Sequence, residues 1–138
     1  MGKQIEVVAA LIWQGERFLL CQRPAHKARG GQWEFAGGKV EPGETKEQAL
    51  IRECREELDI TLSVGAEFLA LTHTYPDLTI HLTVFHSAIS RGTPRLVEHW
   101  DMRWVTPGEA RTLELCPADR TILEQIQKEY PNGKRADS

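Results

Sequence analysis

GGKVEPGETKEQALIRECREELDI, residues 37–60, decides the fold: a glycine-rich loop leads into an amphipathic helix. An α-helix turns by about 100° per residue, so three carboxylates share one face: Glu53, Glu56 and Glu57. A separate apolar face can pack on a core: Leu50, Ile51, Cys54 and Leu58. Like charges at these spacings destabilise an isolated helix by roughly 0.2–0.5 kcal/mol per pair. A hard divalent cation, Mg²⁺ in particular, would offset that repulsion; the alternative is a solvated face that Arg52 and Arg55 partly neutralise.

The boundaries of this helix follow from its flanking residues. Thr45 is the expected N-cap, and Gln48, three residues later, completes a capping box. We expect the helix to end near Leu58. Asp59 then acts as a C-terminal cap in the left-handed region, where glycine is favoured and aspartate is tolerated.

The spacing of the whole stretch is specific over 23 residues. It resembles the Nudix box of the MutT-like pyrophosphohydrolases through Gly38, Glu44, Arg52, Glu53, Glu56 and Glu57. It departs from that pattern at Asp59, where the family usually has glycine. The resemblance extends to residues 33–38 (WEFAGG), to the first hairpin and to residues 117–119 (PAD). Together these segments are most similar to the branch of the family that acts on cytidine triphosphates.

The remaining chain alternates between apolar runs and turn residues. Strands are expected at 5–13, 17–23, 67–73, 78–89 and 102–105, with a short extended piece at 33–35 and a loop at 36–44. Within 78–89, Ile80, Leu82 and Val84 point one way and Phe85 the other. A helical turn is expected at 107–110, then a helix over 117–130 with Ile122, Leu123 and Ile126 on its apolar side. These elements predict an α+β protein with a mixed sheet, and the resemblance implies the α/β/α sandwich of the Nudix fold.

Composition limits the classes of protein and partner. A chain of 138 residues predicts one domain, with a frayed tail over 132–138. The net charge of −3 provides no basic field for polymeric nucleic acid, so a small-molecule partner is favoured. Three scattered cysteines without metal-binding spacing indicate a reducing, cytoplasmic setting, and no apolar run is long enough to span a membrane. Either a monomer or a homodimer is compatible with these features.

The resemblance implies a set of metal-binding and catalytic residues. Its expected metal is Mg²⁺, with Mn²⁺ as a substitute, held by Glu53, Glu56 and Glu57 and by a backbone carbonyl of Gly37 or Gly38. Glu44 and Arg52 correspond to residues that orient these carboxylates through hydrogen bonds. The general base is left open between Glu53 and Glu98, because Glu98 lies on a predicted loop before a strand and resembles a distal glutamate of several Nudix enzymes.

Substrate-binding candidates lie outside the helix. Arg23 and Lys39 are expected to contact phosphates. A nucleobase needs an aromatic wall, for which Phe35, Tyr75 and Phe85 are candidates; a place in the core is the alternative for each. Asp119 corresponds to a base-reading position of the MutT group. An ionised Asp119 would accept a hydrogen bond from an amino group such as cytosine N4.

We therefore expect hydrolysis of a nucleoside triphosphate to the monophosphate and pyrophosphate. The expected substrate is CTP, dCTP or an oxidised or methylated cytidine nucleotide. An 8-oxo-dGTP diphosphatase is the alternative enzyme, and a non-catalytic nucleotide-binding module is the alternative of a different class. Retention of the box glutamates with Glu44 and Arg52 favours an enzyme.

Overall fold

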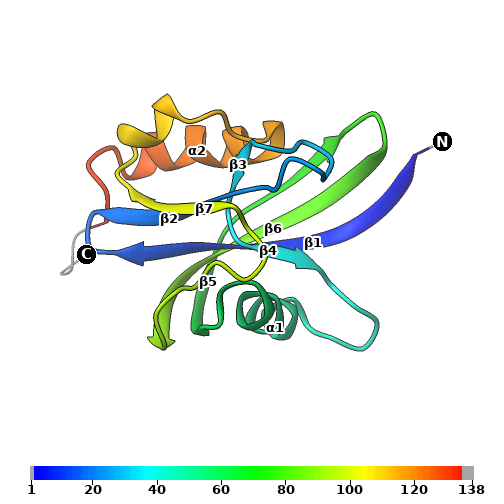
Figure 1. The fold of residues 1–138 in the computed structure, drawn as a ribbon, viewed down its shortest axis with the longest axis horizontal. Coiled ribbons are helices and arrows are strands. Elements are labelled where there is room, and N and C mark those ends of the chain that lie inside the picture. The colour runs from blue at the N-terminus through cyan, green and yellow to red at the C-terminus, as the bar shows by residue number, and fades with distance from the viewer. Residues whose placement is uncertain (1, 135–138) are drawn as a thin grey trace.

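Two helices lie on opposite sides of a mixed β-sheet in the computed structural model, which describes residues 2–134 (Figure 1). Most of the predicted tail, residues 135–138, lies outside the described residues. The helices are α1 (Lys46–Leu58) and α2 (Pro117–Glu129), with a short 3-10 helix at Glu109–Thr112. The strands are β1 (Lys3–Gln14), β2 (Arg17–Gln22), β3 (Trp33–Glu34), β4 (Gly37–Lys39), β5 (Thr61–Thr74), β6 (Leu78–Arg91) and β7 (Asp101–Val105). The expected α/β/α sandwich is confirmed.

The sheet has strand order β3-β2-β1-β6-β5, with β4 paired to β1 and β7 paired to β2. β1 runs parallel to β6, and the other pairs are antiparallel, which makes the sheet mixed. On its other edge, β1 changes partner along its length. Val7 to Ala9 pair with β4, whereas Trp13 and Gln14 form the predicted hairpin with β2. The sheet therefore forks between β4 and β2.

Two strands differ from the expectations. Residues 37–39 form strand β4 inside the expected loop 36–44, because they pair with β1. Two of the three residues are glycines, so the segment has no hydrophobic pattern from which a strand could be predicted. β5 begins at Thr61 instead of residue 67. Its pairing with β6 shifts register between Thr61 and Leu62, between Val64 and Glu67, and between Glu67 and Leu69. Such bulges interrupt the alternation on which strand prediction depends.

Helix α1 has the predicted caps. The Thr45 side chain accepts a hydrogen bond from Gln48 N (3.1 Å), Thr45 N donates to Gln48 Oε1 (2.9 Å), and Asp59 adopts a φ of 56°. Its buried side is formed by Ala49, Leu50, Cys54 and Leu58. The expectation that Ile51 belongs to the packed face is wrong, since Ile51 is 39% exposed and Ala49 is buried instead.

The core is divided into two clusters. One contains Leu82 and Val84 of β6 with Ile122, Leu123 and Ile126 of α2, as the apolar pattern predicted. The other contains Phe85 of β6 and the buried side of α1. The sheet is thus packed on both faces, and α1 carries its acidic face along the edge of one cluster.

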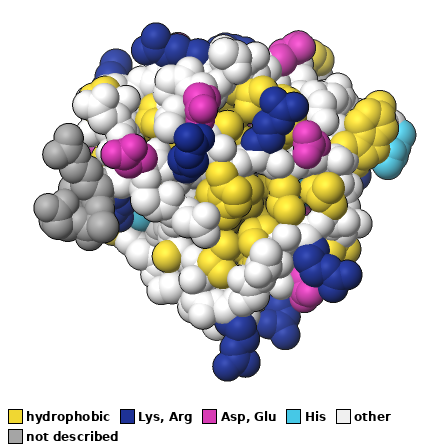
Figure 2. All heavy atoms as spheres, turned by 60° about the vertical axis from the view of Figure 1, so that its left-hand side comes forward, with side chains coloured by type: hydrophobic (Ala, Val, Ile, Leu, Met, Phe, Trp, Pro, Cys, Tyr) yellow, Lys and Arg dark blue, Asp and Glu magenta, His cyan; other side chains and the backbone are white. Residues whose placement is uncertain are grey.

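The surface mixes charge types. On the face seen in Figure 2, basic and acidic side chains are scattered around a central group of hydrophobic side chains. Within residues 2–134, no helix is both long and apolar enough to cross a membrane.

Candidate functional site

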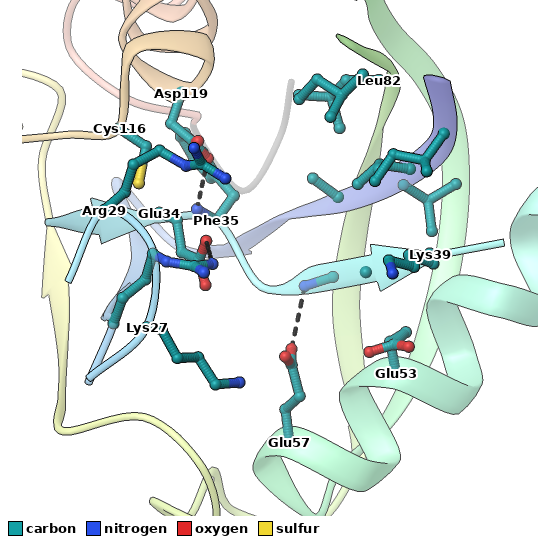
Figure 3. A pocket seen from close by; sticks show the side chains of 18 of the residues that line it. Lys27, Arg29, Glu34, Phe35, Lys39, Glu53, Glu57, Leu82, Cys116 and Asp119 are labelled. Atoms are coloured by element: carbon teal, nitrogen blue, oxygen red, sulfur yellow. Dashed lines mark hydrogen bonds and ion pairs between the residues drawn. The ribbon is translucent and has the colours of Figure 1, made fainter. Parts of the chain in front are cut away.

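A cavity of about 440 Å³ lies between β4, α1 and the start of α2 (Figure 3). Its lining includes most of the predicted site residues: Arg23, Phe35, Gly37, Gly38, Lys39, Glu53, Glu57, Tyr75, Glu98 and Asp119. Four predicted residues do not line it: Glu44, Arg52, Glu56 and Phe85. The cavity therefore joins residues that are more than 90 positions apart, from Arg23 to Asp119.

The acidic end of the cavity is built by α1 against β4. Glu57 Oε1 accepts a hydrogen bond from the backbone N–H of Gly37 (3.2 Å). Gly38 leaves room for the other carboxylate, because a Cβ added there would meet the Glu53 carboxyl group, with Oε1 only 2.8 Å away. The two glycines thus allow the backbone and two carboxylates to approach one another closely.

Burial makes these carboxylates costly to ionise. Desolvation raises the pKa of Glu57 well above its ordinary value, and the nearby charges of Glu34, Glu53 and Glu98 raise it further. Desolvation also raises the pKa of Glu53, although Arg52 partly counteracts it. A bound divalent cation would relieve this crowding of negative charge, and carboxylate oxygens are the ligands that hard cations prefer. In the described chain, however, no three acidic, histidine or cysteine side chains are already gathered as a metal site.

Arg52 lies beside the cavity and holds two of the glutamates. Its Nε and Nη2 donate to the two oxygens of Glu44 (2.7 and 3.0 Å), and its Nη1 donates to Glu53 Oε1 (2.9 Å). Nη2 also reaches the backbone carbonyl of Lys39 (3.0 Å). A planar guanidinium can make all these contacts at once, so Arg52 fixes the Glu53 carboxylate relative to the glycine loop.

Glu56 and Glu98 occupy different positions. Glu56 lies on the outer side of α1 with its side chain 54% exposed, 3.4 Å from Arg52 Nη1. The sequence placed all three box glutamates on one face, but packing against β4 partly buries Glu57 and leaves Glu56 in solvent. Glu98 is exposed on the loop before β7 and lines the same cavity as Glu53 and Glu57.

The opposite end of the cavity carries Asp119, in the first turn of α2. Its Oδ1 accepts a hydrogen bond from Phe35 N (2.9 Å), as Figure 3 shows. Burial, together with the charge of Glu34, raises the pKa of Asp119 to about 8. A pKa near 8 favours the protonated carboxyl group at neutral pH over the ionised acceptor considered from the sequence.

The aromatic candidates also differ in position. Phe35 lines the cavity but is 3% exposed and stacks on Phe18 (centroids 5.6 Å apart). Tyr75 lines it too, yet the Arg29 guanidinium covers its ring, 4.0 Å from the centroid. Phe85 packs in the α1 cluster and does not line the cavity, so the core alternative holds for it.

Five polar residues of the cavity were not predicted as site residues: Lys27, Arg29, Glu34, Glu41 and His99. Lys27 and Arg29 belong to the loop after β2. The number of basic residues in this loop was a sequence signal for phosphate contact. Glu34 accepts a hydrogen bond from Arg23 Nη1 (2.9 Å), while Arg23 Nε donates to Ala28 O (2.8 Å). The sequence offered no signal for His99, because its hydrogen-bond partner, Glu34, is 65 positions away.

Known proteins are similar to this chain in sequence and fold. A family model described as "NUDIX domain" matches residues 7–125. A protein named CTP pyrophosphohydrolase from Escherichia coli (strain K12) is 46% identical over 122 residues, which are 88% of this chain and 90% of that protein. An 8-oxo-dGTP diphosphatase from Proteus vulgaris is 38% identical over 84 residues, 60% of this chain and 75% of that protein. The crystal structure of a MutT protein from Methanosarcina mazei Go1 has a TM-score of 0.81 at 28% identity, covering 93% of this chain and 96% of that chain.

Proposed function

The chain belongs to the Nudix hydrolase family, and from that premise we propose that it converts a cytidine triphosphate to the monophosphate and pyrophosphate with Mg²⁺. The substrate is CTP, dCTP or an oxidised or methylated form. We further propose that the whole chain acts as one domain, as a monomer or homodimer. The cytoplasm is its proposed location, which agrees with three buried, unpaired cysteines among the described residues.

One observation carries the proposal: a single cavity joins the partly buried carboxylates of Glu53 and Glu57 to the Asp119 carboxyl group. The first pair suits a metal-bound phosphate chain, and the last group suits a nucleobase edge. Arg23, Lys39 and Lys27 line the cavity as well and supply positive charge for phosphates. The cavity volume of about 440 Å³ falls within the range of small-molecule binding sites.

The protonation of Asp119 supports a cytosine base. A neutral carboxyl group carries one O–H donor and retains acceptor capacity. Cytosine presents an amino donor at N4 next to an acceptor at N3, so it can exchange two hydrogen bonds with that group. Phe35 and the Arg29-covered Tyr75 then form the walls near the base.

Nudix hydrolases generally need a divalent metal ion. We assign Mg²⁺, with Mn²⁺ as a substitute, to Glu53, Glu56, Glu57 and a backbone carbonyl of Gly37 or Gly38. When bound, this ion neutralises phosphate charge and lowers the pKa of water.

In the proposed reaction, Arg23 and Lys39 orient the phosphates, and Arg52 with Glu44 holds Glu53 in place. Glu98 accepts the proton of the attacking water on its carboxylate. The water oxygen bonds to phosphorus as the anhydride P–O bond breaks and pyrophosphate leaves.

Hydrolysis of 8-oxo-dGTP is the second candidate. The relative with that name supports it, and the ionised fraction of Asp119 can accept from the N–H groups of a guanine. A non-catalytic module is disfavoured, because Arg52 here holds Glu44 and Glu53 in an ordered arrangement.

The test is pyrophosphate release from a panel of common and oxidised nucleotides, compared by kcat/KM with and without Mg²⁺. We expect the highest kcat/KM for a cytidine nucleotide and a large loss in Glu56→Gln. The matched control is Glu47→Gln, an exposed glutamate in the first turn of the same helix, which should behave as wild type. If wild-type protein released no pyrophosphate from any nucleotide, the enzyme reading would be abandoned.

A further inference from the structure

His99 is a buried histidine beside the exposed Glu98. Its side chain is 4% exposed, and its Nε2 lies 2.9 Å from Glu34 Oε2. Glu34 can only accept when ionised, so Nε2 carries the proton and donates it. Among the described residues, Nδ1 of His99 is buried without a hydrogen-bond partner. The ring therefore makes a single specific polar contact.

The same carboxylate serves two sides of the cavity. Glu34 Oε1 accepts from Arg23 Nη1 at 2.9 Å, while Oε2 accepts from His99. Burial would raise the pKa of Glu34, but the hydrogen bond from His99 and the charge of Arg23 outweigh burial and lower it. Glu34 thus stays ionised and ties the phosphate-binding candidate Arg23 to the loop that carries Glu98.

The loop has few other anchors. Arg95 N donates to Leu58 O (2.9 Å) and Trp100 N donates to Gln22 O (3.0 Å), while Val97 N donates to Arg95 O within the loop (3.0 Å). Arg95 Nη1 also donates to Asp59 Oδ2 (3.3 Å), but both of these side chains are exposed. Between the backbone contacts to Leu58 and Gln22, His99 has the only buried side chain of residues 95–100. The nearby side chains of Val97 (56% exposed) and Trp100 (57% exposed) do not pack into the protein. The orientation of Glu98 therefore depends on His99.

We propose that His99 is a positioning residue that, through its hydrogen bond to Glu34, aims Glu98 at the acidic end of the cavity. The inference rests on the proposed function, in which Glu98 accepts the proton of water. Without the bond, the loop keeps its backbone contacts to Leu58 and Gln22, but Glu98 gains freedom to move. Loss of such a supporting hydrogen bond typically lowers activity 10-fold to 100-fold.

The experiment is a double-mutant cycle between His99→Leu and Glu98→Gln, measured as kcat and KM with the preferred nucleotide and Mg²⁺. His99→Leu should lower kcat about 10-fold to 100-fold in wild type and change it little in the Glu98→Gln background. KM should change less than about threefold, because Arg23 keeps its own contacts. His99→Gln should recover most of kcat, since its amide nitrogen reaches as far as Nε2. Val97→Ala, the exposed neighbour on the other side of Glu98, is the control and should match wild type.

A second readout does not depend on turnover. In metal-free protein, amide hydrogen exchange of Trp100 N–H should be faster in His99→Leu than in wild type, while His99→Gln and Val97→Ala should stay close to wild type. Unchanged exchange in His99→Leu would contradict the anchoring role, and if the leucine variant does not fold, His99→Asn takes its place.

The remaining outcomes separate the two proposals. An equal loss of kcat from His99→Leu with and without Glu98→Gln would show that His99 acts independently of Glu98 and would overturn the inference. Full activity of Glu98→Gln alone would overturn it too, while leaving hydrolysis intact. Absence of hydrolysis in wild type would instead count against the proposed function itself.

Discussion

Asp119 Oδ1 accepts a hydrogen bond of 2.9 Å from the backbone N–H of Phe35, although 84 positions separate the two residues. The contact fixes the first turn of α2 against the chain between β3 and β4. Two residues beyond Phe35, the N–H of Gly37 binds Glu57 of α1. Side chains at both ends of the cavity are therefore hydrogen-bonded to one short segment, residues 35–37.

The pKa of Asp119, raised by burial to about 8, predicts a pH-dependent preference for the base. Below that pH, the neutral carboxyl group pairs with the donor–acceptor edge of cytosine; above it, the carboxylate only accepts and suits the N–H groups of a guanine. The ratio of kcat/KM for CTP to that for 8-oxo-dGTP should therefore fall as pH rises through about 8. Steady-state kinetics from pH 6 to 9 measure this ratio, which should follow the titration of a single group.

Asp119→Asn is the control, because it keeps the acceptor for Phe35 N–H but cannot ionise. Its ratio should be flat over the same range. A wild-type ratio that does not change with pH would remove Asp119 from base recognition.

The same shift predicts how stability depends on pH. The folded protein holds the Asp119 proton between the ordinary pKa of 3.8 and about 8, where the unfolded chain has released it. More protons on the folded state mean that this residue's contribution to the free energy of unfolding decreases as pH rises across that window. Urea unfolding at several pH values should show a weaker decrease in Asp119→Asn than in wild type. Identical slopes would contradict a raised pKa.

Glu57→Gln should exchange activity for stability. Desolvation raises the pKa of the partly buried Glu57 carboxyl group well above its ordinary value, so this group lowers the stability of the metal-free protein at neutral pH. Glutamine removes the ionisable group and keeps an oxygen for Gly37 N–H, so the Tm should rise while kcat falls by about 100-fold or more. Mg²⁺ should raise the Tm of wild type more than that of the variant. A lower Tm without metal in Glu57→Gln would refute the argument.

Gly38→Ala should impair the site without unfolding the protein. A methyl group at this position meets the flexible end of Glu53, so the carboxylate must move away from the glycine loop. We expect kcat to fall about 10-fold to 100-fold with little change in Tm. Gly108→Ala is the matched control, since its nearest neighbour would be 4.0 Å away. Equal activities of the two variants would mean that the position of Glu53 is not critical.

Arg52→Lys should also lower kcat, by about 10-fold, because an ammonium group cannot bind both oxygens of Glu44 and reach Glu53 at once. Arg55→Lys, on the exposed side of α1 where Arg55 contacts Thr61 Oγ1 (2.9 Å), should keep wild-type kinetics. Comparison of kcat and KM for the two lysine variants measures the difference. Indistinguishable values would indicate that charge alone matters at Arg52.

The fold was largely predictable where local patterns act alone. The caps of α1, the first hairpin and the apolar side of α2 depend on residues within a few positions of each other, and all three are confirmed. β4 and the first half of β5 were missed, because pairing with β1 and bulged pairing with β6 define them. Ile51 was misplaced because the width of the buried stripe on α1 depends on what the sheet offers it.

For the site, the sequence by itself determined the family and the acidic cluster of α1, since the spacing of Gly38, Glu44, Arg52 and the glutamates is a one-dimensional property. Tertiary structure alone decided which of those glutamates are partly buried, that the pKa of Asp119 is raised, and that Glu34 joins Arg23 to His99. The physical reason is that burial and charge proximity arise between residues distant in the chain. Desolvation and Coulomb interactions depend on distance in space, which no spacing along the sequence records.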